Sequence, residues 1–147
     1  MTLANALPSL ANDVPTLVFL AGAAHLGILI ASALVPFRLS WREELAGLSL
    51  LHRQMYWVYG GYVVLAIVSF ALISMTNAEE IASGSGLARG FCFYVAVFWG
   101  VRVGLQLVFD VKVHLTMWWL KAGYHLLTVL FLGFTALYGW LALRPPP

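Results

Sequence analysis

The chain has 147 residues, of which 62% are apolar or aromatic and only 10% are Asp, Glu, Lys or Arg. A soluble domain carries about 25% charged residues, so a chain with so few charges cannot cover a surface that faces water. The composition therefore excludes a soluble globular fold. The net charge of +2 is also too small and too dispersed for a protein that binds nucleic acid.

Four apolar stretches dominate the sequence, at residues 14–37, 54–75, 90–109 and 119–143. Each one reaches the roughly 20 residues that an α-helix needs to cross a bilayer. The links between them are too short to hold a domain outside the membrane. The sequence predicts an all-α fold, in which a single transmembrane domain over residues 1–147 forms an up-down-up-down four-helix bundle in the lipid bilayer.

The basic residues at the ends of these stretches predict the orientation. Five of them flank the first and third links, whereas only two lie on the opposite side. The first group is Arg38, Arg42, Arg53, Lys112 and Lys121, and the second is Arg89 and Arg144. Because the side richer in Lys and Arg normally faces the cytoplasm, we expect a multi-pass protein of the inner or plasma membrane with both termini outside.

The four histidines fall into two pairs by their depth along the predicted helices. His25 and His125 both lie roughly 10 to 17 Å inside the cytoplasmic rim, at about 1.5 Å of rise per residue. His52 and His114 lie close to that rim, near the starts of the second and fourth helices. Each pair thus draws one histidine from the fourth helix or from its N-terminal extension.

Two helices carry polar faces inside the membrane. Eleven residues separate His114 from His125, and at 100° per residue this leaves them about 20° apart on one helix face. That face contains His114, Trp118, Lys121, His125, Thr128, Leu132 and Thr135. The third helix has Arg102, Gln106 and Asp110 at intervals of four residues. Both faces are expected to point into the bundle.

Small residues surround His25 and recur on the third helix. Ala21, Gly22 and Gly27 remove bulk beside the imidazole, and Gly100 and Gly104 form a GxxxG motif. Small residues allow either a flat ligand or a second helix to approach closely. The sequence leaves both interpretations open.

A haem with two histidine ligands needs two neutral imidazoles at one depth on facing helices, and a cation or donor for its propionates. His25 and His125 meet the first requirement, and Arg102 lies at a similar depth to meet the second. His52 and His114 form a second candidate pair nearer the cytoplasm. The pairing by depth favours two haem sites for the set, although a histidine taken singly inside a membrane is more often a hydrogen-bonded contact between helices than a ligand.

This arrangement of His25, His52, His114 and His125, with one histidine on the first helix, one on the second and two on one face of the fourth, resembles the four-helix di-haem cytochrome b class of membrane electron carriers. The resemblance covers the bundle. It implies b-type haem held by these four ligands, and electron transfer linked to a quinone or to a protein partner. That class usually has its termini inside, which differs from the orientation predicted here.

Three other functions stay open from the sequence. The first is an accessory or scaffold subunit, which would contact a protein partner or a second copy through the GxxxG motif and Arg102. The second is an oxidoreductase that holds non-haem iron, copper or zinc with the four histidines and Asp110 or Glu44. The third is a transporter that works through the histidines and Arg102.

Overall fold

A computed structural model describes residues 3–38, 45–108 and 118–145 of the chain. In these ranges the structure is helical, with short turns and no strand. The order is α1 (Leu3–Arg38), the 3₁₀ helix η1 (Leu45–Gly47), α3 (Leu50–Thr76), α4 (Ala78–Ser83), α5 (Gly86–Val108) and α6 (Trp118–Leu143). The all-α prediction is confirmed for the described residues.

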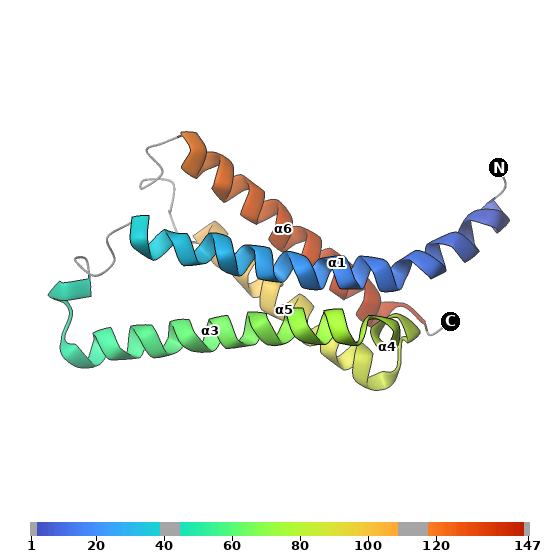
Figure 1. Ribbon diagram of the computed structural model, residues 1–147, viewed down its shortest axis with the longest axis horizontal. Helices are drawn as coiled ribbons and strands as arrows, with labels where there is room; N and C mark the ends of the chain where they lie inside the picture. The colour runs from blue at the N-terminus through green and yellow to red at the C-terminus, as the bar shows by residue number, and fades with distance from the viewer. Residues whose placement is uncertain (1–2, 39–44, 109–117, 146–147) are drawn as a thin grey trace. The chain divides into compact units, whose positions relative to one another are not determined.

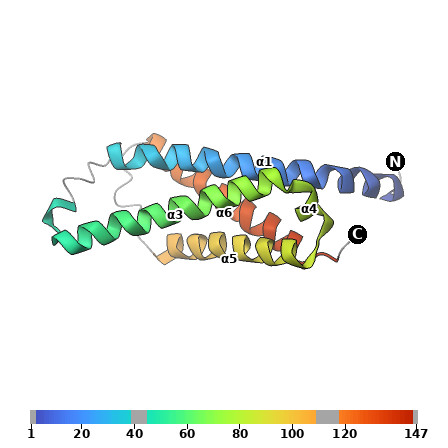
Figure 2. The ribbon, with the colours of Figure 1, turned by 60° about the horizontal axis from the view of Figure 1, so that its bottom comes forward.

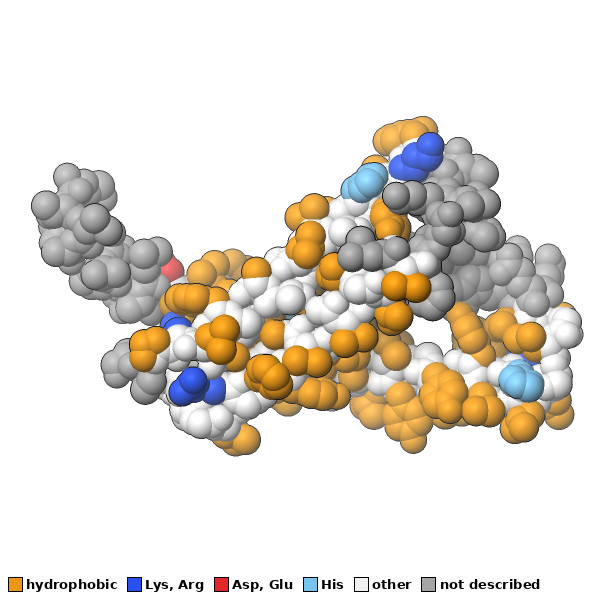
Figure 3. Space-filling model, turned by 180° about the vertical axis from the view of Figure 1, so that it is seen from behind, with side chains coloured by type: hydrophobic (Ala, Val, Ile, Leu, Met, Phe, Trp, Pro, Cys, Tyr) orange, Lys and Arg blue, Asp and Glu red, His pale blue; other side chains and the backbone are white. Residues whose placement is uncertain are grey.

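Four of the described helices are long and apolar enough to cross a membrane. The apolar segments are Asp13–Ser32, Leu50–Thr76, Gly86–Gln106 and Lys121–Leu143, each of which overlaps one predicted stretch. On the face that Figure 3 shows, apolar side chains cover most of the described helices, and the visible charged groups lie toward helix ends. The chain is therefore described as a multi-pass membrane protein.

The contacts divide the chain into two units, residues 1–78 and residues 79–147, and each is described by itself. The predicted single domain and the up-down-up-down order stay predictions.

In the first unit, α1 and α3 run antiparallel (Figures 1 and 2). Val14, Val18, Ala21, His25 and Ile28 form a buried stripe along α1, with the alternating steps of four and three residues that mark one helix face. The buried residues of α3 are Ile67, Phe70, Ala71 and Ser74. They lie in its C-terminal half, which is where the closest contacts with α1 occur.

The second unit is built on an antiparallel pair, α5 and α6. Both ribbon views show these helices close together at the Gly86 and Leu143 ends and farther apart at the other ends (Figures 1 and 2). Trp99 is almost fully buried, stacked on Phe131 with ring centroids 4.7 Å apart and tilted on Phe134 at 5.3 Å. This aromatic group forms the centre of the pair, because offset stacking adds to the packing of large apolar side chains.

The turn between α4 and α5 follows from three residues. Gly84 has a φ of 72°, a backbone conformation that glycine adopts without strain. Ser85 then caps α5, since its Oγ accepts a hydrogen bond from the backbone N–H of Ala88 at 3.3 Å. The Ser85 hydroxyl also donates to Glu80 Oε1 at 2.6 Å, which ties the cap back to α4.

Candidate functional site

His25 lies on the buried stripe of α1 and is 0% exposed. Its Nδ1 is 2.7 Å from the carbonyl oxygen of Ala21, one turn earlier in the same helix. Because a carbonyl only accepts hydrogen bonds, Nδ1 carries the proton and the lone pair of the neutral ring is on Nε2. This is the orientation that a backbone carbonyl gives to histidines that coordinate metal through Nε2.

The aromatic ring of Phe70 on α3 fixes the other side of this imidazole. The two ring centroids are 6.1 Å apart at an interplanar angle of 73°, which is an edge-to-face contact. His25 is therefore held both by its own helix and by the facing helix.

The glycines on either side of His25 have different roles. A Cβ atom on Gly22 would come within 2.9 Å of the Ala71 carbonyl oxygen and 2.7 Å of Met75 Cγ on α3. A Cβ atom on Gly27 would meet nothing within 4 Å. Gly22 thus lets α1 and α3 approach closely. Of the two interpretations that the sequence left open, a flat ligand or a second helix, the second holds at Gly22.

The GxxxG motif of α5 divides in the same way. A Cβ atom on Gly100 would lie 3.6 Å from Thr135 Cγ2 on α6, whereas one on Gly104 would meet nothing within 4 Å. Gly100 therefore faces the partner helix within the unit, and Gly104 does not contact it.

His52 takes part in the start of α3. Ser49 is the N-cap, and its Oγ lies 3.5 Å from the backbone nitrogen and 2.6 Å from Nδ1 of His52. The side chain is exposed. A cap of this kind satisfies a backbone N–H that the helix leaves unpaired, so His52 has a structural role that the sequence analysis missed, although Ser49 three residues earlier was the signal for it.

His25 and His52 belong to one unit but not to one site. His25 contacts Phe70, and eighteen residues of α3, or about 27 Å of helix, separate Phe70 from His52. The two histidines therefore cannot bind the same metal ion. Among the described residues, no group of three or more His, Cys, Asp or Glu side chains is arranged to hold one.

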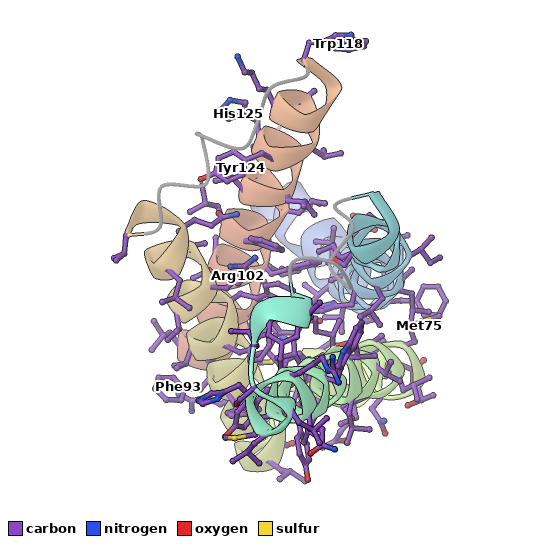
Figure 4. All side chains as sticks on the ribbon, turned by 90° about the vertical axis from the view of Figure 1, so that its left-hand side faces the viewer. Met75, Phe93, Arg102, Trp118, Tyr124 and His125 are labelled. Atoms are coloured by element: carbon purple, nitrogen blue, oxygen red, sulfur yellow. The ribbon has the colours of Figure 1, made fainter. Side chains whose placement is uncertain are left out.

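His125 is exposed near the N-terminal end of α6, where its ring meets Tyr124 edge to face at 5.7 Å (Figure 4). His114 lies outside the described residues, as do Asp110 and Glu44. The pair of His25 with His125 joins the two units, and the pair of His52 with His114 reaches outside the described ranges. Both pairings stay predictions.

The polar faces of α5 and α6 meet through Gln106. The Thr128 hydroxyl lies 3.3 Å from Gln106 Oε1 and 2.8 Å from the Tyr124 carbonyl, and the Tyr124 hydroxyl donates to the Gln106 carbonyl at 3.5 Å. These contacts support the expectation that Gln106 and Thr128 point into the pair. The side-chain and backbone oxygens of Gln106 therefore have hydrogen-bond donors within the unit.

Arg102 lies one turn before Gln106, between the ribbons of α5 and α6 in Figure 4. Its side chain is exposed, and its guanidinium carbon lies 5.6 Å from the centroid of the Phe131 ring. A cation over an aromatic face at this distance is attracted by the ring quadrupole. The ring also fixes the level of the positive charge along α6.

Two arginines at the other end of the unit connect helix termini. Arg89 Nε donates to the Ala142 carbonyl at 2.9 Å, and Arg144 Nη2 donates to the Ala82 carbonyl. Both carbonyls belong to the last turns of helices, where backbone acceptors lack partners and the helix dipole attracts cations. The sequence analysis used these arginines only to predict the orientation.

Comparisons with models of protein families, with curated proteins and with solved structures find no match to this chain. The environments of His25 and Arg102 are therefore the features of the chain that bear on its function.

Proposed function

We propose that the chain is a membrane electron-transfer protein that binds b-type haem, with His25 as an axial ligand. The observation that carries the proposal is the bond from His25 Nδ1 to the Ala21 carbonyl in the apolar interior of the first unit. His25 suits haem ligation, because this bond selects the tautomer that coordinates iron through Nε2. Haem would supply one-electron oxidation and reduction when bound.

The chain's own residues would hold and insulate this group. The Ala21 carbonyl orients His25, Phe70 restricts rotation of its ring, and the apolar stripe around it excludes water. His125 is proposed as the second ligand at this site, and His52 with His114 as the ligands of a second haem. In the di-haem cytochrome b class that the chain resembles, two haems pass electrons across the bilayer.

The first test is an absorption spectrum of protein purified from haem-replete cells, recorded oxidised and after reduction with dithionite. Bis-histidine haem b should give a sharp Soret band and a resolved α band on reduction. A colourless preparation would refute the proposal.

The second test assigns the ligands. His25→Ala and His125→Ala should each remove the same haem and leave the other partly occupied, while His52→Ala should remove the complementary one. Gly90→Ala on α5 is the matched control, because the added methyl group meets nothing within 4 Å and Gly90 is not beside a histidine in the sequence, so the haem content should be unchanged. If His25→Ala and His125→Ala both keep full haem content, the proposed pairing is wrong.

We also propose the up-down-up-down topology in the inner or plasma membrane, with both termini outside. Its support is the excess of Lys and Arg at the first and third links. The test is a reporter that is active only after translocation, fused after Pro147. With the C-terminus outside, this fusion should be active. An inactive fusion would overturn the orientation without affecting the haem proposal.

A further inference from the structure

The guanidinium of Arg102 lies level with the middle of α6, although Arg102 itself is six residues before Val108, the end of α5. The guanidinium lies over Phe131, which is thirteen residues after Trp118 and twelve before Leu143, the two ends of α6. At about 1.5 Å per residue, the charge is thus level with a point about 18 to 20 Å from either end of that helix.

Among the residues that the structure describes, this guanidinium has no hydrogen-bond or ion-pair partner, and it lies over the Phe131 ring. The nearby side chains do not supply a negative charge. Gln106 and Thr128 are neutral and bonded to each other. A cation at this depth is costly unless an anion or several acceptors surround it, and charged residues inside membranes typically pair with one another.

No acidic residue of the chain lies between the ends of an apolar segment. All six acidic residues lie at or beyond the ends of the four apolar segments. They are Asp13, Glu43, Glu44, Glu79, Glu80 and Asp110. A second copy of the chain would offer the same residues at the same levels, so a homo-oligomer does not provide the missing charge either.

We infer that Arg102 docks this chain onto a transmembrane helix of a different protein, one that carries an Asp or Glu near its middle. The surface beside the guanidinium suits a helix, because Val101 and Leu105 of α5 are 58% and 40% exposed and apolar. The carboxylate would pair with the cation while apolar side chains pack around both. The inference matches the accessory-subunit interpretation of the sequence, and it does not depend on whether haem binds.

The test uses a synthetic helix as the partner. The full-length protein is reconstituted in phosphatidylcholine vesicles with a labelled leucine-rich transmembrane peptide that has one central Glu, or with the same peptide carrying Gln. Energy transfer from a label on the protein measures association. The Glu peptide should bind about tenfold more tightly than the Gln peptide, since the charge adds to a hydrogen bond that both peptides make.

Variants at one position then assign the effect. Arg102→Gln should abolish the preference for the Glu peptide, and Arg102→Lys should retain it, because lysine keeps the positive charge. Arg89→Gln, at the far end of α5, is the matched control and should keep the full preference for the Glu peptide, although it loses the bond to the Ala142 carbonyl. Equal binding of the two peptides, or a preference that survives Arg102→Gln in a preparation whose circular dichroism is unchanged, would overturn the inference.

Two further arms separate the other anions that Arg102 would attract. If phosphatidylglycerol in the vesicles abolishes the preference, the guanidinium binds lipid phosphate and the inference fails. If Arg102→Gln lowers haem content and the unchanged protein shows no preference for the Glu peptide, the residue serves a haem propionate instead. A colourless preparation that still prefers the Glu peptide would refute the haem proposal alone.

Discussion

Replacing Gly22 with alanine tests the closest packing between α1 and α3. The new Cβ atom would lie 2.9 Å from the Ala71 carbonyl oxygen and 2.7 Å from Met75 Cγ, whereas ordinary contacts begin at 3.4 Å. The Met75 side chain can rotate away from the methyl group. The carbonyl oxygen belongs to the backbone of α3, so the two helices must separate by about 0.5 Å at this point.

The cost follows from two opposing terms. Forcing an extra methyl group into a packed site costs about 1–3 kcal/mol. Alanine is a better helix former than glycine, which returns up to about 1 kcal/mol. We therefore expect Gly22→Ala to lower the free energy of unfolding by up to about 2 kcal/mol.

The assay is reversible unfolding in mixed micelles, with increasing mole fraction of sodium dodecyl sulfate, followed by circular dichroism. Gly27→Ala is the control and should be neutral or slightly stabilising, because nothing lies within 4 Å of the added atom. The double variant with Met75→Ala should recover only part of the loss, since the carbonyl contact remains. Equal stability of the Gly22→Ala and Gly27→Ala proteins would refute the packing argument, and full recovery in the double variant would show that Met75 alone limits the contact.

Three further predictions concern the second unit and use the same unfolding assay. Trp99→Ala should cost about 3 kcal/mol because the indole is buried against two aromatic rings, while the half-exposed Trp140→Ala should cost less than about 1 kcal/mol; similar losses would contradict the burial. A double-mutant cycle with Gln106→Leu and Thr128→Val should give a coupling energy of about 0.6 kcal/mol, the average for hydrogen bonds between membrane helices. Zero coupling would show that this hydrogen bond contributes nothing to stability. Arg89→Gln should cost about 1 kcal/mol through the lost bond to the end of α6, and an unchanged midpoint would show that this end needs no cap.

The number and approximate positions of the long helices could be predicted from the sequence, because apolar runs of this length leave few alternatives in a membrane. The ends were less predictable. The first helix was expected over residues 14–37, but α1 begins at Leu3. The expected start excluded the polar Asn12 and Asp13, and Pro15 lacks the N–H that would bond within the helix. The helix continues through these residues because none of them prevents helical dihedral angles.

The contacts inside each unit were not predictable, because they depend on which helix faces meet. Gly22 and Gly27 are equivalent in the sequence as small residues near His25, yet only Gly22 lies against α3. Gly100 and Gly104 differ in the same way. Residue type shows where close packing is allowed, whereas the rotation of each helix about its axis decides where it occurs.

The described histidines show that depth and residue type do not by themselves define a ligand. His25 is buried with its proton directed to a backbone carbonyl, His52 is part of a helix cap, and His125 is exposed beside Tyr124. Coordination requires a nitrogen that carries no proton and a ring that is already oriented. On this criterion His25 is the strongest candidate. The Nδ1 atom of His52 is likewise engaged, by Ser49 Oγ, so His52 would also coordinate through Nε2.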